Sequence, residues 1–129
     1  MLPYLRRWAA QGRKPNGDNA TTIFDLLPDR RHVAVYPATV DTFAVIVAAP
    51  GVRMLAATAS SGEACAVPAE HATHGRRLLG LRPYPPAHEL PQPMELYVVL
   101  PDAEIHIVYG HDQLRPLIAA LTEITDWLT

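Results

Sequence analysis

The densest group of residues able to bind a metal or to act in catalysis lies between residues 63 and 74. It contains one thiol, two imidazoles and two carboxylates: Glu63, Cys65, Glu70, His71 and His74. His71 and His74 share a face if this segment is helical, and with Cys65 or Glu70 they offer three ligands for a zinc ion. No C-x-x-C or H-E-x-x-H spacing is present. Cys65, His71 and His74 are therefore weak metal candidates, and we predict no metal and no cofactor.

Cys65 is the single cysteine of the chain, and it has two competing interpretations. It can act as a nucleophile with His71, His74 or His106 as its base, because such partners meet in space rather than in sequence. It can also be a small buried thiol, and this interpretation is favoured because cysteine is among the most often buried residues. The sequence has no G-x-S-x-G elbow and no glycine-rich phosphate loop. The sequence leaves enzymatic activity open, but it favours a protein that is not an enzyme.

His106 lies within a predicted strand, between two isoleucines that point to the other face. On an exposed face it is a contact residue or a pH-sensitive residue, with His32 as a neighbour across the sheet. On a covered face it is a neutral histidine satisfied by one hydrogen bond, which is the interpretation we favour. A mixed apolar and polar surface is typical of a protein interface. The interface candidates on the second face of the sheet and in the proline-rich segment are His32, Ala34, Tyr36, Tyr84, Tyr97 and His106.

The charges of the chain argue against nucleic acid as a partner. Its net charge is −2 and its isoelectric point is near 6.3. Two basic stretches, at residues 6–14 and 76–84, carry arginines beside aromatic residues. Neither resembles a nucleic-acid-binding module, and thirteen acidic residues offset them.

Length and composition predict one domain over residues 1–129. The chain has 49% hydrophobic residues and 13 prolines. It lacks both the apolar core of a secretory signal and a run of about 20 apolar residues, so no membrane partner is expected. One cysteine fits a reducing compartment, and a cytoplasmic location is expected.

The predicted sheet is centred on residues 42–49, an apolar run whose two faces are both unsuited to water. A β-branched run at 32–36 precedes it. Pro50 and Gly51 favour a turn, and residues 54–58 then continue as a third strand, which gives an antiparallel meander. A hairpin follows later, with strands at 95–100 and 104–109.

Two helices are expected at the ends of the chain. Apolar residues recur at helical spacing over 2–9, with Gly12 as the stop. The last segment carries one apolar stripe from Leu114 to Leu128, and its regular part is predicted to begin at Arg115 or Pro116. Residues 22–25 have the pattern of a helix start, with a short strand as the alternative.

Residues 60–94 have no clear periodicity. A short helix at 69–79 is weakened by Gly75 and Gly80, and the prolines from 83 to 93 exclude regular structure. We therefore expect an irregular, proline-rich insert at about 60–94.

The predicted fold is α+β, with a single antiparallel sheet of about five strands and the N- and C-terminal helices packed on one face. This order of elements is similar to that of small dimeric secretion chaperones, and small immunity proteins also use α+β folds. We expect a non-enzymatic protein-binding domain that acts through a sheet face or the proline-rich segment. Its partner is another protein or a second copy in a homodimer. The alternative is a small enzyme or ligand-binding protein with a pocket near His71, His74 and His106.

Overall fold

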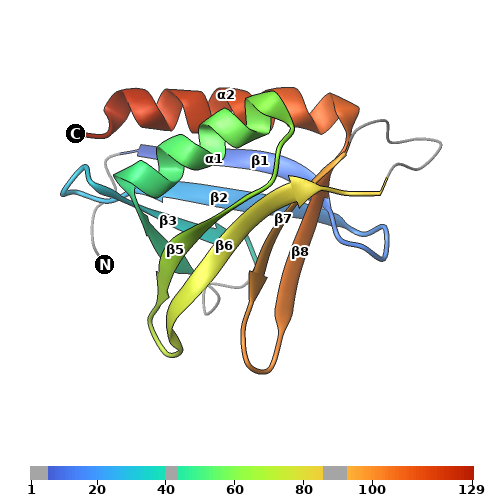
Figure 1. The fold of residues 1–129 in the computed structure, drawn as a ribbon, viewed down its shortest axis with the longest axis horizontal. Helices are drawn as coiled ribbons and strands as arrows, with labels where there is room; N and C mark the ends of the chain where they lie inside the picture. The colour runs from blue at the N-terminus through green and yellow to red at the C-terminus, as the bar shows by residue number, and fades with distance from the viewer. Residues whose placement is uncertain (1–5, 40–43, 86–92) are drawn as a thin grey trace.

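The chain folds into a closed antiparallel barrel, seen in a computed structural model that describes residues 6–39, 44–85 and 93–129 (Figure 1). The described residues form eight strands, which neighbour each other in chain order, and two helices. The first half contains β1 (Arg6–Arg13), β2 (Asn19–Leu26), β3 (His32–Pro37), β4 (Val45–Ala48) and α1 (Ala49–Ser61). The second half contains β5 (Cys65–His71), β6 (Gly75–Pro83), β7 (Met94–Val99), β8 (Glu104–Tyr109) and α2 (His111–Trp127). Each half is therefore four strands followed by a helix.

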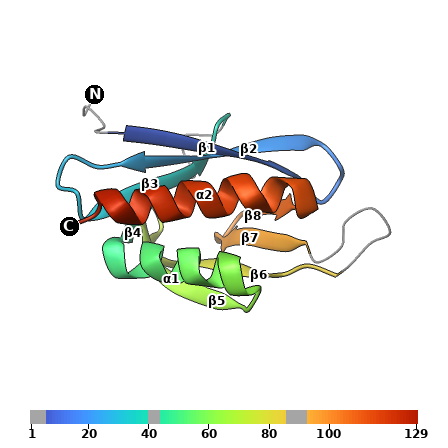
Figure 2. The ribbon, with the colours of Figure 1, turned by 90° about the horizontal axis from the view of Figure 1, so that it is seen from above.

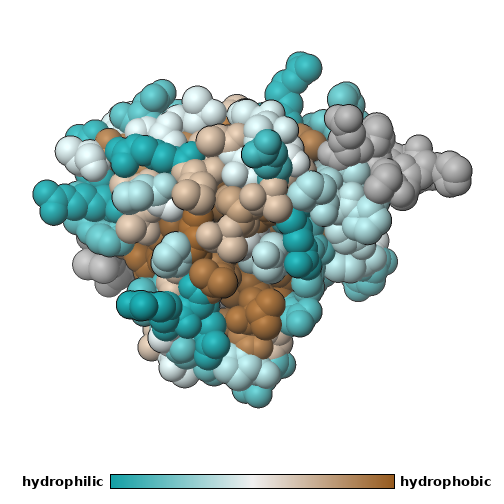
Figure 3. Space-filling view, viewed as in Figure 1, coloured by the Kyte–Doolittle hydropathy of each residue, from teal (hydrophilic) through white to brown (hydrophobic). Residues whose placement is uncertain are grey.

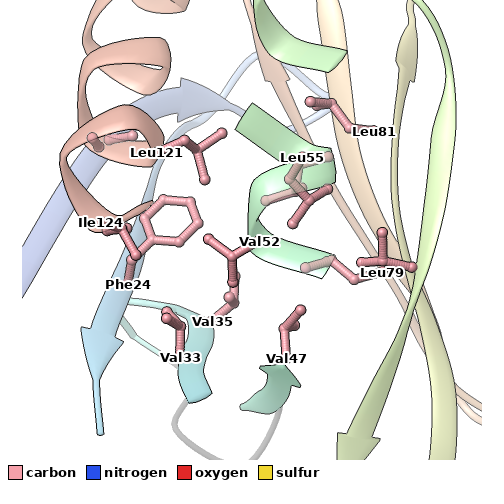
Figure 4. Packing of buried hydrophobic residues seen from close by; sticks show 14 of the residues in the cluster. Phe24, Val33, Val35, Val47, Val52, Leu55, Leu79, Leu81, Leu121 and Ile124 are labelled. Atoms are coloured by element: carbon pink, nitrogen blue, oxygen red, sulfur yellow. The ribbon is translucent and has the colours of Figure 1, made fainter. Parts of the chain in front are cut away.

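The two helices run side by side across one end of the barrel, between its two halves (Figure 2). Alternate residues of the strands point inward and meet apolar residues of both helices. Figure 4 shows this packing for Phe24, Val33, Val35, Val47, Val52, Leu55, Leu79, Leu81, Leu121 and Ile124. One apolar core thus joins both halves of the chain.

The predicted single sheet of about five strands, with helices on one face, is wrong. The strands close on one another and enclose the core, and the two helices cover one end of the barrel. The predicted N-terminal helix is also wrong over its described part, since residues 6–9 belong to β1 and residues 1–5 lie outside the described residues. Trp8 and Ala10 are buried while Arg7 and Ala9 are exposed, which is the alternation of a strand. The pairing of β1 with β2 overrides the helical spacing of the apolar residues.

The predicted third strand of the meander, residues 54–58, lies in helix α1. Pro50 stands in the first turn of this helix, a position that tolerates proline, and does not form the expected turn. The buried residues Ala49, Val52, Leu55 and Ala59 recur every three or four positions. Of the predicted central strand at 42–49, residues 45–48 form β4, and residues 42 and 43 lie outside the described residues.

The expected irregular insert at about 60–94 is wrong for most of its described part. Residues 65–71 and 75–83 form β5 and β6, paired around a turn, so the weaker alternative of a short helix over 69–79 is also wrong. Its residues 86–92 lie outside the described residues. Residues 22–25 belong to β2, which is the strand alternative.

The strand at 32–36, the C-terminal hairpin and the C-terminal helix are confirmed. Helix α2 begins earlier than predicted, at His111, and contains Pro116 in its interior. Its start is fixed by Gly110, whose N–H donates to Gln113 Oε1 at 2.9 Å. The buried side chains of Leu117, Leu121 and Ile124 offset the backbone hydrogen bond that Pro116 cannot donate.

The barrel is closed by few strand pairs at two seams. Strands β4 and β5 pair at two positions, and β1 and β8 pair only at Arg13 and Val108. Gly12 allows this close approach, because a Cβ there would lie 2.5 Å from Ile107 Cγ2. From Ile107 back to Glu104, β8 has no paired residue among the described residues of β1.

Tyr109 makes the stability of the fold depend on pH in the alkaline range. Its side chain is fully buried and shares a hydrogen bond with the Thr22 hydroxyl, and burial raises the pKa of its phenol above the ordinary value of 10. In the unfolded chain the phenol ionises near pH 10, whereas in the folded chain it stays neutral to a higher pH. Its stabilising contribution is therefore complete below about pH 10 and is lost as pH rises, by up to about 1.4 kcal/mol per pH unit.

We expect Tyr109→Phe to cost about 1 kcal/mol at neutral pH, because Thr22 loses its partner. Urea unfolding between pH 7 and 11.5 should then show a shallower alkaline loss than in the wild type. Tyr84→Phe, at a half-buried position, is the control and should keep the wild-type slope. Identical slopes for all three proteins would contradict the assignment to Tyr109.

Candidate functional site

The outer face of β6, β7 and β8 carries a connected set of charged and aromatic side chains. Cross-strand register brings them together, since Arg82 pairs with Glu95 and Tyr97 pairs with His106. We call this set the Glu95 cluster; its members are Arg82, Glu95, Tyr97, Glu104 and His106.

Glu95 is the centre of this cluster and is almost completely buried, with 4% of its surface exposed. Arg82 donates to Glu95 Oε1 through Nε at 2.9 Å, and its NH2 nitrogen lies 2.8 Å from the same oxygen. This hydrogen bond raises the pKa of Arg82 above its usual range. On the other side, His106 Nδ1 lies 3.2 Å from Glu95 Oε2. A buried carboxylate thus has a cationic or titratable partner at each oxygen.

His106 contacts two carboxylates at once. Its Nε2 lies 2.6 Å from Glu104 Oε2, while Nδ1 faces Glu95. His106 is therefore held between the exposed carboxylate of Glu104 and the buried carboxylate of Glu95.

Tyr97 is held in place from both sides of its ring. The ring lies over Gly80 on the neighbouring strand, where any Cβ would overlap it. The Arg82 guanidinium lies 4.0 Å from the ring centroid on the exposed side, which is a close cation–π contact. These two contacts preset the orientation of an aromatic side chain at the surface.

Exposed apolar side chains border the cluster on β6 and β7. Leu78 is 57% exposed and Val99 is 49% exposed. Both line a surface hollow of about 410 Å³, together with Pro68, Arg76, Arg77 and Tyr97. We call these six residues the outer patch. Figure 3 shows hydrophobic surface gathered over β5, β6 and β7, below helix α1.

The outer face of the first half is arranged differently. Asp25 is completely buried and accepts hydrogen bonds from Arg7 Nε at 2.7 Å, from Arg7 NH2 at 3.0 Å and from the Tyr36 hydroxyl. Beside it, Ile23, Ala34 and Tyr36 form a small buried apolar cluster. This face is covered and satisfied, which is typical of a structural ion pair.

The six interface candidates fall in three regions. Tyr97 and His106 lie together in the Glu95 cluster, whereas Ala34 and Tyr36 lie on the buried outer face of the first half. His32 contacts Asp29 in the β2–β3 turn. The pKa of Asp29 is lowered, chiefly because its carboxylate accepts a hydrogen bond from the Arg31 backbone N–H and secondly because it shares one with the His32 side chain. His32 and His106 are not neighbours, because β3 and β8 are not adjacent. Tyr84 follows β6, and its N–H donates to the Pro93 carbonyl at 2.9 Å.

The structure separates the weak metal candidates. Cys65 and His71 are at opposite ends of β5, about 20 Å apart at the rise of a strand. His71 and His74 stack with ring centroids 4.9 Å apart, and His71 Nδ1 accepts the N–H groups of Thr73 and His74. The described residues contain no group of three or more His, Cys, Asp or Glu side chains suited to a metal ion.

The alternative pocket requires His71, His74 and His106 to meet. His106 lies on β8, which β6 and β7 separate from β5, and its ring faces Glu95 and Glu104. His71 instead ends β5, and His74 lies in the turn between β5 and β6. The arrangement of these three residues does not form one site.

Sequence reasoning missed Leu78 and Val99 as surface residues. Both lie in short apolar runs, which are typical of buried strands. The signal that was present is the period of two, since their neighbours Leu79 and Val98 are buried. Only the strand register shows that Leu78 and Val99 take the outer face.

Comparison with known proteins finds no matching family model, no matching curated sequence and no matching solved structure. Within the described residues, neither helix has the length and apolar character required to cross a membrane.

The geometry of the Glu95 cluster predicts that neutralising Glu95 lowers stability more than neutralising Glu104. Glu95→Gln removes the charge that two partners share in a buried position, and we expect it to lower the unfolding free energy by about 1–3 kcal/mol. Glu104→Gln is the matched control; 59% of that side chain is exposed, so the loss should be below about 1 kcal/mol. Urea denaturation at pH 6.5 measures both. Equal losses would contradict the central role of Glu95.

Proposed function

We propose that this chain is a non-enzymatic protein-binding domain that contacts its partner through the outer patch. The observation that carries this proposal is the pair of exposed side chains, Leu78 and Val99, beside a fixed tyrosine on a rigid sheet. Large apolar side chains that line one hollow are a feature of binding surfaces.

The composition of the outer patch supports a protein as the ligand. The centres of protein interfaces are enriched in tyrosine, arginine and large apolar residues. Tyr97 enters an interface with its orientation already set by Gly80 and Arg82, which lowers the entropy lost on binding. The hollow beside it accepts one apolar side chain of the partner.

The charge of the patch defines the partner further. Arg76 and Arg77 line the hollow, and neither has an ion pair among the described residues. The complementary surface is an apolar centre flanked by carboxylates. The proline-rich residues 86–92, part of the other predicted contact segment, lie outside the described residues.

Site-specific photo-crosslinking in the cells of origin tests the proposal. A photoreactive residue at position 78 or 99 should give the same discrete adduct, and Arg76→Glu together with Arg77→Glu should reduce its yield at least tenfold. The matched control is position 57, an exposed alanine on helix α1 outside the patch, which should give no such adduct.

Circular dichroism and thermal melting should show that the position 78 and 99 proteins remain folded, because both side chains are exposed. Adducts of equal yield from positions 57, 78 and 99 would refute the proposal. An adduct of twice the chain mass would identify a homodimer. The partner at the outer patch would then be a second copy of this chain and not a different protein.

A further inference from the structure

The edge of β8 that faces β1 is largely unpaired. Among the described residues, β8 pairs with β7 along its whole length but with β1 only at Val108. Within the described part of the chain, residues Glu104–Ile107 therefore present one free edge, about 13 Å long at the rise of a strand. Alternate residues along such an edge offer a backbone N–H and a carbonyl with no strand to receive them.

The β1–β2 turn cannot continue the ladder along this edge. Lys14 N–H donates to the Asp18 carbonyl at 2.7 Å, and Gly17 N–H donates to the Lys14 carbonyl at 2.9 Å. Pro15, between them, has no N–H to donate. The turn satisfies its own backbone and leaves the edge of β8 available.

A groove lies between this edge and the turn. It has a volume of about 370 Å³ and is lined by Lys14, Pro15, Asn16, Ala20, Pro37, Thr39 and residues 104–107. An extended chain of three or four residues matches the length of the edge. Pro37, Ile105 and Ile107 also line a second, apolar void of about 20 Å³.

The side chains of the groove define what it accepts. Ile105 and Ile107 point inward, whereas Glu104 and His106 point outward, so an added strand must alternate apolar and polar residues. Glu104 and His106 already pair with each other. Lys14, on the opposite wall, has no ion pair among the described residues, so it favours a carboxylate on the incoming strand.

We infer that the β8 edge binds an extended peptide segment of a partner protein by strand addition. The segment has apolar residues at alternate positions, directed at Ile105 and Ile107, and an acidic residue beside Lys14. Backbone hydrogen bonds supply the affinity and the alternating side chains supply the specificity. The groove and the outer patch have different linings, since the groove is lined by β8 and the β1–β2 turn whereas the outer patch lies on β5, β6 and β7.

Selection of phage-displayed random dodecapeptides on the intact protein tests this inference. We expect enriched sequences with alternating apolar residues and one acidic residue. Binding of the synthesised peptides, measured by fluorescence anisotropy, should weaken at least tenfold when alternate backbone nitrogens are methylated. Hydrogen exchange of the amides in Glu104–Ile107 should slow when peptide is bound.

A charge swap isolates the contact with Lys14. Lys14→Glu should weaken the acidic peptide at least fivefold, and replacing the acidic residue of the peptide by lysine should restore binding to this variant. Arg53→Glu, the same reversal at an exposed position on helix α1, should leave both peptides unchanged. Leu78→Ser should also leave peptide binding unchanged, which separates this inference from the function proposed for the outer patch.

Three results would overturn the inference. One is a selection that enriches no peptide of this pattern, and another is full binding by the N-methylated peptides. The third is concentration-dependent dimerisation of the chain alone, with protection of the same β8 amides, because the occupant would then be a second copy.

Discussion

The structure depends on one constraint, which is that both four-stranded halves share a single apolar core with helices α1 and α2. Among the residues that the structure describes, the seams contribute one strand pair between β1 and β8 and two between β4 and β5. Strand pairing alone therefore closes little of the barrel. Packing of Val52 and Leu55 on α1, and of Leu121 and Ile124 on α2, against inward-facing strand residues holds the halves together.

This inward packing decides what the outer surfaces are free to do. Because the core satisfies the inner faces, the outer face of β6–β8 can carry the Glu95 cluster and still expose Leu78 and Val99. The outer face of the first half instead buries Asp25 beneath Arg7 and Tyr36. The same four-strand arrangement therefore carries a covered surface in one half and an accessible surface in the other. The narrow closure at Arg13 and Val108 adds the free edge of β8 as a further consequence.

Several elements were predictable because their signals are local. The run at 32–36 and the hairpin at 95–109 have β-branched residues bounded by turn residues, and α2 carries one apolar stripe. The pairing of Tyr97 with His106 across that hairpin follows from its short turn. Residues 54–58 and 6–9 were mistaken because short apolar runs fit both a helix and a strand, and neighbours distant in sequence make the choice. Trp8 is in a strand because β2 lies beside it.

The sequence by itself determined a mixed α and β chain, an apolar strand within residues 42–49, a C-terminal hairpin and helix, and the absence of any strong catalytic or metal-binding motif. These properties depend on residue type and spacing within a few positions. Only the tertiary structure decided that the strands close into a barrel, that Glu95 lies buried between Arg82 and His106, and that Leu78 and Val99 face outward. Each of these depends on register between strands, and a shift of one residue would exchange the two faces of every strand.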